Sequence, residues 1–478
     1  MLFNSLHYAA FLPIVLIGYF LLADKRRWAW LLAASCYFYA VFVPAYLLIL
    51  GGTIVVDYFA GLLIERASGK KRRMWLIVSI VANVGVLAVF KYYDFLNHNL
   101  EQLWNLFGLS YPVRDLGLLL PVGLSFHTFQ AMSYTVEVYR GHQKAERHFG
   151  IYALYVMFFP QLVAGPIERP QNMLHQFRER HPFVYHNFTQ GLALIAWGLF
   201  KKVAIADRLS TYVSAVYDAP QPVGAVPAIV GTVFFAFQIY CDFSGYSDIA
   251  IGSAQLMGYR LMTNFRRPYF ASSVSEFWTR WHISLSTWFR DYVYIPLGGN
   301  RAGELTWYRN LLFTFLLSGL WHGANWTFVV WGGLNGVYLV SSLMTRKLRG
   351  RLTQQLHLDR VPGIHRLLQV AFTFTIICVS WVFFRANSMT VAVDLLRSMT
   401  GPWHVSDLAK MGGSDLPLAA ALIALLLLVE WRVSDVPLPV YLNTRTPRVR
   451  WAAVYAISLA TILFGVFTAQ KAFIYFQF

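Results

Sequence analysis

The chain has 478 residues, of which 57% are hydrophobic, 17% aromatic and only 13% charged. Because a soluble domain carries about 25% charged residues, this composition excludes an ordinary water-soluble protein and predicts an integral membrane protein. The net charge of +17, from 40 Lys and Arg against 23 Asp and Glu, then indicates basic loops that fix topology and meet anionic lipid, rather than nucleic-acid binding.

Apolar segments follow one another along the whole chain, and a spanning helix needs about 20 apolar residues. Several middle segments are short and broken by Pro or Gly, which is tolerated only where protein or a water-filled cavity surrounds the backbone. We therefore expect an all-α polytopic membrane protein with about 11 transmembrane helices plus partial or amphipathic helices. The candidate spans are residues 6–23, 28–43, 46–64, 75–90, 116–139, 151–165, 188–205, 225–240, 249–258, 311–343, 365–384, 416–431 and 451–467.

The basic loops predict the orientation of the chain. DKRR at 24–27 follows the first apolar run, which is therefore interpreted as a retained helix and not as a signal peptide. GKKRR at 69–73 lies two spans beyond DKRR, and RGHQKAERH at 140–148 lies two spans further on. All three basic loops are therefore on the same side of the membrane. Placing these loops in the cytoplasm satisfies the positive-inside rule and puts the N-terminus outside.

The three cysteines lie in apolar stretches without a C-x-x-C pair: Cys36, Cys241 and Cys378. They predict neither a disulfide framework nor a zinc site, and we interpret them as small core residues. We expect no metal and no tightly bound cofactor.

Polar groups at membrane depth are costly, so they are the first candidates for function. In FFAFQIYCDFSGYSDIAIG at 234–252, Asp242 and Tyr246 share one helical face, and Ser244 and Asp248 share a neighbouring one. These side chains either pin adjacent helices together or line an aqueous or substrate cavity. The residues alone leave both interpretations open.

A second polar stretch runs from residue 264 to 301, and its centre at 272–292 is predicted as one amphipathic helix. Ser272 or Ser273 is its expected cap, with Glu276 completing a capping box. An apolar stripe of Trp and Leu faces a polar side, so the helix would lie in the interface or line a cavity. His282 sits beside the stripe, either as a hydrogen-bonded structural residue or as a catalytic one. The stripe and the polar side comprise Trp278, Trp281, Leu285 and Trp288 against Arg280, Ser284, Arg290 and Asp291.

PLGGNR at 296–301 ends this stretch with a turn. Such a turn could present backbone N–H groups and the Arg301 guanidinium to an anion, although it is also an ordinary helix stop. Asn300 belongs to the same turn.

The most unusual polar residue is His322, in the middle of LLFTFLLSGLWHGANWTFVVWGGLNG at 311–336. Gly319 and Gly323 flank it and could allow close helix approach or clear space for a substrate. An imidazole in apolar surroundings favours its neutral form and can accept a proton from a hydroxyl or thiol. It could equally hydrogen-bond a neighbouring helix.

No G-x-S-x-G elbow, H-E-x-x-H pair, Walker A loop, dinucleotide G-x-G-x-x-G or His-x4-Asp box occurs. Three long motifs do occur in order: YCDFSGYSDIAIG, FWTRWHISLSTWFRDYVYIPLGGNR and LLSGLWHGANWTFVVWGGLNG. Together they resemble the membrane-bound O-acyltransferase (MBOAT) family, most of all the bacterial branch typified by the alginate O-acetylation membrane protein. Similar segments over nearly the whole chain are LPVGLSFHTFQAMSYTVEVYRG, FPQLVAGPIERP, WVFFRA and the C-terminal FIYFQF.

The resemblance implies one membrane domain over 1–478, with a core motif region at about 120–340 and C-terminal helices at about 364–478 around a central tunnel. The family's near-invariant histidine maps onto His322. Its second polar position maps onto His282, where many eukaryotic relatives carry Asn. Cys241 is a departure, because relatives often have an aromatic residue there. Candidates for lining the tunnel are Asp242, Ser244, Tyr246, Asp248, Arg280, Trp281, Ser286, Arg290, Asn300, Arg301, Trp321 and Asn325.

The resemblance further implies a polysaccharide O-acetyltransferase subunit in the bacterial inner membrane. The expected donor is cytoplasmic acetyl-CoA, with a carrier-protein thioester as the alternative. The acceptor would be hydroxyls of alginate, cellulose, peptidoglycan or another exopolysaccharide, reached through a periplasmic SGNH-type O-acetyltransferase partner. His322 would be the general base or an acyl relay, and His282 would orient the acyl carbonyl or a hydroxyl. The alternatives are D-alanyl transfer to teichoic acid by a related enzyme, and a non-enzymatic transporter or flippase.

Overall fold

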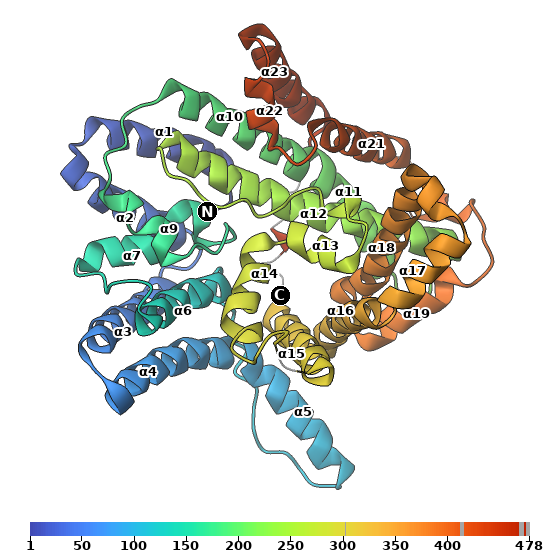
Figure 1. Ribbon diagram of the computed structural model, residues 1–478, viewed down its shortest axis with the longest axis horizontal. Coiled ribbons are helices and arrows are strands. Elements are labelled where there is room, and N and C mark those ends of the chain that lie inside the picture. The colour runs from blue at the N-terminus through green and yellow to red at the C-terminus, as the bar shows by residue number, and fades with distance from the viewer. Residues whose placement is uncertain (302, 412–414, 468–472, 475–478) are drawn as a thin grey trace. The chain divides into compact units, whose positions relative to one another are not determined.

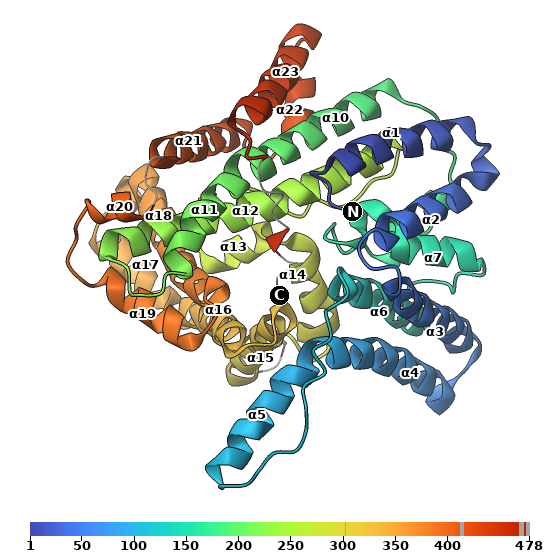
Figure 2. The ribbon, with the colours of Figure 1, turned by 180° about the vertical axis from the view of Figure 1, so that it is seen from behind.

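The structure is a computed structural model that describes residues 1–301, 303–411, 415–467 and 473–474, so the last four residues of FIYFQF lie outside it. The regular structure of the described residues is entirely helical (Figure 1, Figure 2), which confirms the all-α prediction. Seven helical stretches within them are long and apolar enough to cross a membrane: Tyr46–Arg66, Gly69–Leu106, Tyr185–Tyr217, Ala225–Leu256, Trp326–Met344, Pro362–Arg385 and Leu416–Val433.

The chain divides into two compact units. The first comprises Met1–Ile195 and Tyr246–Met262, and the second comprises Ala196–Gly245 and Thr263–Ile474. Two helices, α10 (Tyr185–Leu199) and α12 (Ala225–Leu256), contribute residues to both units.

The first unit begins with a series of long helices and ends in short ones. Within it, α3, α4 and α6 pack against one another, and α5 extends away from them (Figure 1). Buried polar bonds join these helices: the Ser79 hydroxyl donates to Asp57 Oδ1 at 2.6 Å, and the Asn83 amide donates to Asp57 Oδ2 at 2.8 Å. The elements are α1 (Leu6–Leu21), α2 (Asp24–Ala40), α3 (Tyr46–Arg66), α4 (Gly69–Leu87), η1 (Ala88–Tyr92), α5 (Tyr93–Leu106), α6 (Leu124–Arg140), α7 (Phe149–Met157), α8 (Phe159–Leu162), α9 (Pro170–Met173) and η2 (Gln176–Arg178).

The second unit holds the motifs FWTRWHISLSTWFRDYVYIPLGGNR and LLSGLWHGANWTFVVWGGLNG, together with the C-terminal helices. Its centre is the antiparallel pair α15 and α16, with α18 and the short helix α13 packed against α16. Its elements are η3 (Phe200–Ala206), α11 (Asp207–Tyr217), η4 (Pro268–Phe270), α13 (Val274–Arg280), α14 (Ile283–Phe289), η5 (Arg290–Tyr294), α15 (Glu304–His322), α16 (Trp326–Met344), α17 (Arg346–Gln355), η6 (Leu358–Arg360), α18 (Pro362–Arg385), α19 (Met389–Met399), α20 (Asp407–Lys410), α21 (Leu416–Val433), α22 (Leu438–Asn443) and α23 (Pro447–Phe464).

Several predicted segments have different boundaries in the structure. The candidate spans 225–240 and 249–258 are parts of the single helix α12, because no helix-breaking Pro lies between them. The predicted span 311–343 is two helices, because Gly323 is extended and Asn325 caps α16 by accepting the Thr327 N–H at 3.0 Å. These boundaries depend on local backbone conformation and capping, which the hydrophobicity of the sequence does not predict.

The predicted helix 272–292 is also broken, between Trp281 and His282. Ser273 caps α13 as expected, accepting the Glu276 N–H at 3.2 Å, while the Glu276 carboxylate accepts from the Ser272 N–H at 2.7 Å. The helix nevertheless ends after seven residues, because Trp281 is extended, with φ −103° and ψ 128°, and His282 adopts a left-handed backbone with φ 42° and ψ 55°.

Two glycines set the distance between α15 and α16. A Cβ on Gly319 would lie 2.3 Å from the Phe328 carbonyl oxygen, and one on Gly332 would lie 2.3 Å from the Phe315 carbonyl oxygen. Both obstacles are backbone atoms, which cannot rotate away. The absence of side chains at these two positions therefore permits the close approach of the helices, in the manner of small-residue membrane interfaces.

We predict that Gly319→Ala forces α15 and α16 apart and lowers the free energy of unfolding by about 1–3 kcal/mol, the usual cost of overpacking. Thermal unfolding of the detergent-purified protein measures this. Gly333→Ala is the matched control, because its Cβ would meet only the Leu316 side chain, at 3.5 Å. Equal melting temperatures for the two variants would contradict the prediction.

Candidate active site

His322 is the last residue of α15, and its side chain is enclosed by aromatic rings. Its ring centroid lies 4.8 Å from that of Trp321, 5.0 Å from that of Trp331 and 5.3 Å from that of Phe384. Only 4% of the residue is exposed. The imidazole is thus shielded from bulk water. Electrostatic interactions in such a buried environment are stronger than in solution.

His282 lies at the junction of α13 and α14 and is also buried, with 1% of the residue exposed. The Phe243 ring meets it edge-on at 4.6 Å, and the Trp321 ring lies 6.5 Å away. Since Trp321 also neighbours His322, the structure brings the two sequence-predicted histidines to the same indole. Burial lowers the pKa of His282 to about 3, so this imidazole is neutral at physiological pH.

Asn264 is a residue of this site that the sequence reasoning missed. Its side chain is buried, and its Oδ1 lies 3.1 Å from His282 Nδ1, 2.9 Å from the Ser284 hydroxyl and 3.2 Å from the Ser284 backbone nitrogen. The sequence signal was weak, because Asn264 precedes the predicted helix in a stretch without periodicity. A polar residue shortly before an unexplained histidine was the available hint.

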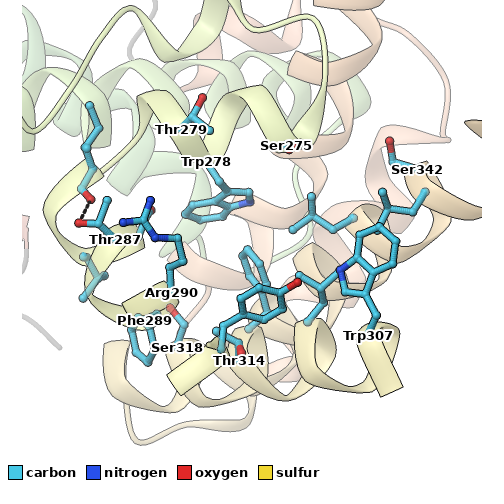
Figure 3. A pocket seen from close by; sticks show the side chains of 18 residues that line it. Ser275, Trp278, Thr279, Thr287, Phe289, Arg290, Trp307, Thr314, Ser318 and Ser342 are labelled. Carbon is cyan, nitrogen blue, oxygen red and sulfur yellow. Dashed lines mark hydrogen bonds between the residues drawn. The ribbon is translucent and has the colours of Figure 1, made fainter. Parts of the chain in front are cut away.

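A cavity of about 500 Å³ lies in the same unit (Figure 3), and neither His282 nor His322 lines it, although Ile283, the residue after His282, does. Among the predicted tunnel-lining residues, Ser286 and Arg290 line it. Ser318 also lines it and lies one turn before His322 on α15, so the cavity wall continues along that helix towards the histidine. The full lining is Ser275, Trp278, Thr279, Ile283, Leu285, Ser286, Thr287, Phe289, Arg290, Tyr294, Trp307, Leu311, Thr314, Phe315, Ser318, Leu339, Ser342 and Leu343.

Trp278 connects this cavity to the rings around His322. Figure 3 shows its indole in the middle of the lining side chains. The ring lies 5.2 Å from Phe315 and 5.8 Å from Trp331, which itself packs on His322. Within the described part of the chain, the Trp278 indole N–H is buried and has no hydrogen-bond acceptor. A bound molecule with a carbonyl or amide oxygen would supply one.

Three other predicted residues of the second unit shape the site from outside the cavity. Arg280 binds Glu276 at 2.8 Å and Asp435 at 2.9 Å. Trp281 is fully buried and packs on Trp381, with ring centroids 5.1 Å apart. Asn325 caps α16. Their contacts fix the loops that carry the two histidines.

The turn at 296–301 is a helix stop in the structure. The N–H groups of Gly298, Gly299 and Arg301 donate to carbonyl oxygens of Ile295, Tyr294 and Gly298. Three N–H groups of the turn are therefore already bonded, which favours the helix-stop interpretation over an anion site. Asn300 and Arg301 are exposed and lie outside the cavity lining.

The polar residues of α12 divide between the two units. Tyr246 and Asp248 belong to the first, where the Tyr246 ring stacks on Phe3 at 4.3 Å and Asp248 is half-buried. Asp242 and Ser244 belong to the second and bind lysines of η3: Lys202 Nζ lies 2.5 Å from Asp242, and Lys201 Nζ donates to Ser244 at 2.9 Å.

The sequence reasoning missed both lysines, although two charges inside the predicted span 188–205 were a visible signal. Lys202 also binds Asp207 at 2.8 Å, and each of these three side chains is only 4% exposed. The backbone N–H of Ile474 donates to the other Asp242 oxygen at 2.8 Å. Asp242 is thus part of an ion cluster that joins η3, α12 and the end of the described chain.

We predict that Lys202→Met lowers the free energy of unfolding by about 3–5 kcal/mol, because it leaves two buried carboxylates without their cation. Denaturation of the purified protein in detergent measures this loss. The matched control is Arg397→Met, which removes an exposed ion pair with Asp394 and should change stability by less than about 1 kcal/mol. Similar effects of the two substitutions would contradict the assignment.

Comparisons with known proteins identify relatives of this chain. The model of the membrane-bound O-acyltransferase family matches residues 146–386, which include both histidines and Asn264. The probable alginate O-acetylase AlgI of Pseudomonas putida is 37% identical and covers 98% of both chains. A peptidoglycan O-acetyltransferase of Helicobacter pylori is 37% identical over 84% of this chain and 80% of its own. A teichoic acid D-alanyltransferase of Bacillus subtilis is 25% identical over 55% and 66%.

Proposed function

The chain belongs to the membrane-bound O-acyltransferase family, and from this premise we propose that it is the membrane subunit of a bacterial polysaccharide O-acetylation system. It is a multi-pass membrane O-acyltransferase related to alginate and peptidoglycan O-acetyltransferases. The proposal adds the acyl group, acetyl; the donor, cytoplasmic acetyl-CoA; and the acceptor class, hydroxyls of an extracytoplasmic polysaccharide such as alginate, cellulose or peptidoglycan.

The observation that carries this proposal is the placement of His322. Its ring is buried among Trp321, Trp331 and Phe384, one helical turn beyond a cavity wall. A buried imidazole one helical turn from a residue of the cavity wall is suited to take a proton from a hydroxyl or thiol that enters from that side. The family resemblance assigns the catalytic position to this same residue.

The chemistry requires one acyl transfer. The oxygen of the acceptor hydroxyl forms a bond with the acetyl carbonyl carbon, while the carbon–sulfur bond of the thioester breaks. His322 takes the hydroxyl proton and returns it to the departing thiolate, so that the products are an acetyl ester and a free thiol. In the relay variant of this step, a ring nitrogen of His322, Nε2 or Nδ1, first takes the acetyl group from the thioester and then passes it to the acceptor hydroxyl.

The cavity beside His322 is proposed as part of the donor's path. Its wall combines aromatic rings with the hydroxyls of Ser286, Thr314 and Ser318 and the guanidinium of Arg290. Apolar walls with a few polar groups are typical of small-molecule sites. The unsatisfied N–H of Trp278 supports the same use, because a donor's carbonyl oxygen would satisfy it.

We further propose a topology of about 11 spans around a central tunnel. Four helices that are shorter or less apolar than the seven long stretches would complete it: α1, α2, α15 and α23. The basic loops support a bacterial inner-membrane topology in which the acetyl-CoA side faces the cytoplasm, near anionic lipid, and the N-terminus lies outside. A periplasmic SGNH-type partner would complete transfer to the polymer.

D-alanyl transfer to teichoic acid is the second candidate. It is favoured only by the D-alanyltransferase relative, whose likeness covers about half of this chain at 25% identity. Mass spectrometry of the modified polymer separates an acetyl from a D-alanyl ester. Family membership argues against a non-enzymatic transporter.

We predict that His322→Ala abolishes acetylation of the cell's polysaccharide, because it removes the group that moves the proton. Ester content is measured by mass spectrometry, and membrane levels and melting temperature establish that the variant is folded. The control is His404→Ala, which changes an exposed histidine of the same unit and should leave acetylation at the wild-type level. Full acetylation by a folded His322→Ala protein would remove the central claim.

For His282→Ala we predict a severe but incomplete loss of acetylation, because the residue orients a reacting group and does not itself move the proton. The rate of acetyl-CoA consumption by purified protein measures it. A wild-type rate would return His282 to a structural role.

A further inference from the structure

His282 has a left-handed backbone, and Asn264 contacts the residues that follow it. A φ of 42° is uncommon for a residue other than Gly, although His adopts it more often than most, and such conformations persist where the surroundings support them. The Ile283 N–H donates to the Asn264 carbonyl at 2.9 Å. One residue beyond, the Ser284 N–H and hydroxyl both reach the Asn264 side chain, at 3.2 and 2.9 Å.

These contacts also decide which nitrogen of His282 carries the proton. A backbone N–H can only donate, so the Asn264 atom that faces the Ser284 N–H must be the carbonyl oxygen and not the amide nitrogen. That same oxygen lies 3.1 Å from His282 Nδ1. Because a carbonyl oxygen can only accept, Nδ1 must be the protonated nitrogen. In a neutral imidazole, Nε2 then carries the lone pair.

We propose that Asn264 is a positioning residue that fixes His282 as a hydrogen-bond acceptor at Nε2, so that His282 holds the attacking hydroxyl and not the acyl carbonyl. An Nε2 lone pair can accept the hydroxyl O–H, whereas a carbonyl oxygen needs a donor, which this tautomer does not offer at Nε2. The inference rests on the proposed function, and it separates the two roles that the sequence left open for His282. Trp278, with its unsatisfied N–H, remains as a donor for the carbonyl.

The groups around His282 explain why an uncharged partner is sufficient. Among the described residues, its ring contacts Phe243 of α12, Phe265 and Trp321 of α15, together with Asn264 and Ser284. The charged or titratable residues on these elements have partners of their own: Asp242 binds Lys202, Arg280 binds Glu276 and Asp435, and His322 lies among aromatic rings. Burial therefore dominates and lowers the pKa of His282.

The decisive substitution is Asn264→Asp, which keeps an oxygen at the position of Oδ1 but gives it a negative charge. A carboxylate beside Nδ1 stabilises the imidazolium and raises the pKa of His282. The wild-type imidazole stays neutral down to low pH, whereas in the variant it gains a proton as pH falls through the raised pKa, and the Nε2 lone pair is lost. We expect the acid limb of the kcat/KM profile to move to higher pH by about 1–3 pH units.

The measurement uses full-length protein in native membrane vesicles, with [¹⁴C]acetyl-CoA as the donor and thiol release as the readout. Asn264→Ala removes the acceptor without adding charge, so it should lower the rate by at least tenfold and leave the acid limb in place. The matched control is Asn310→Asp, which changes an equally buried asparagine that holds the turn at 297–299. Its acid limb should stay at the wild-type pH.

An active Asn264→Asp protein with an unmoved acid limb would overturn the inference while leaving the proposed function intact. A wild-type protein that does not consume acetyl-CoA would instead overturn the proposed donor. For the case in which Asn264→Asp does not fold, ¹⁵N NMR of histidine-labelled wild-type protein decides the question, with His282→Gln to assign the signal. We expect an unprotonated Nε2; a proton on Nε2 would overturn the inference.

Discussion

The interaction on which the second unit depends is the pairing of polar side chains inside an apolar interior. A buried charge or amide without a partner costs several kcal/mol, so each polar residue on a helix there constrains what must lie opposite. Lys202 shows this most clearly, because one ammonium group satisfies Asp207 and Asp242 together. The ion cluster fixes η3 against α12, and Phe243, next to Asp242, then packs edge-on against His282.

Breaks in helices, more than the helices themselves, place the two histidines. His322 ends α15 because Gly323 is extended and Asn325 starts α16. His282 separates α13 from α14 because its backbone is left-handed. A side chain at a helix end is free of the crowding from a following turn, and loop positions on a rigid scaffold commonly carry function. The close approach of Gly319 and Gly332 then brings Trp331 of the second helix onto the His322 ring.

Much of the chemistry could be predicted from the sequence, because residue type and motif order survive without coordinates. The helical class, the family and the importance of His282 and His322 as buried polar groups were all accessible in this way. The Ser273 cap was accessible too, since capping depends on neighbours within four residues. The helix break at His282 was not, because the Asn264 contacts that accompany its left-handed backbone come from 18 residues earlier. The hydrogen bonds inside the turn at 296–301 were not accessible either, because they cannot be read from its Gly-Gly sequence.

The polar residues of α12 show why a motif does not by itself define a site. Asp242, Ser244 and Tyr246 stand close together in one stretch of helix, yet Asp242 and Ser244 bind lysines whereas Tyr246 stacks on Phe3. Asp242 and Tyr246 share a helical face but lie one turn apart, and the helix passes from the second unit to the first between them, so each meets a different partner. The motif therefore positions the scaffold, whereas Asn264, outside every motif quoted for the family, determines the hydrogen-bonding state of His282. The described side chains that contact the His282 ring are uncharged, and burial among them lowers the pKa of this imidazole, whereas a carboxylate partner would raise it.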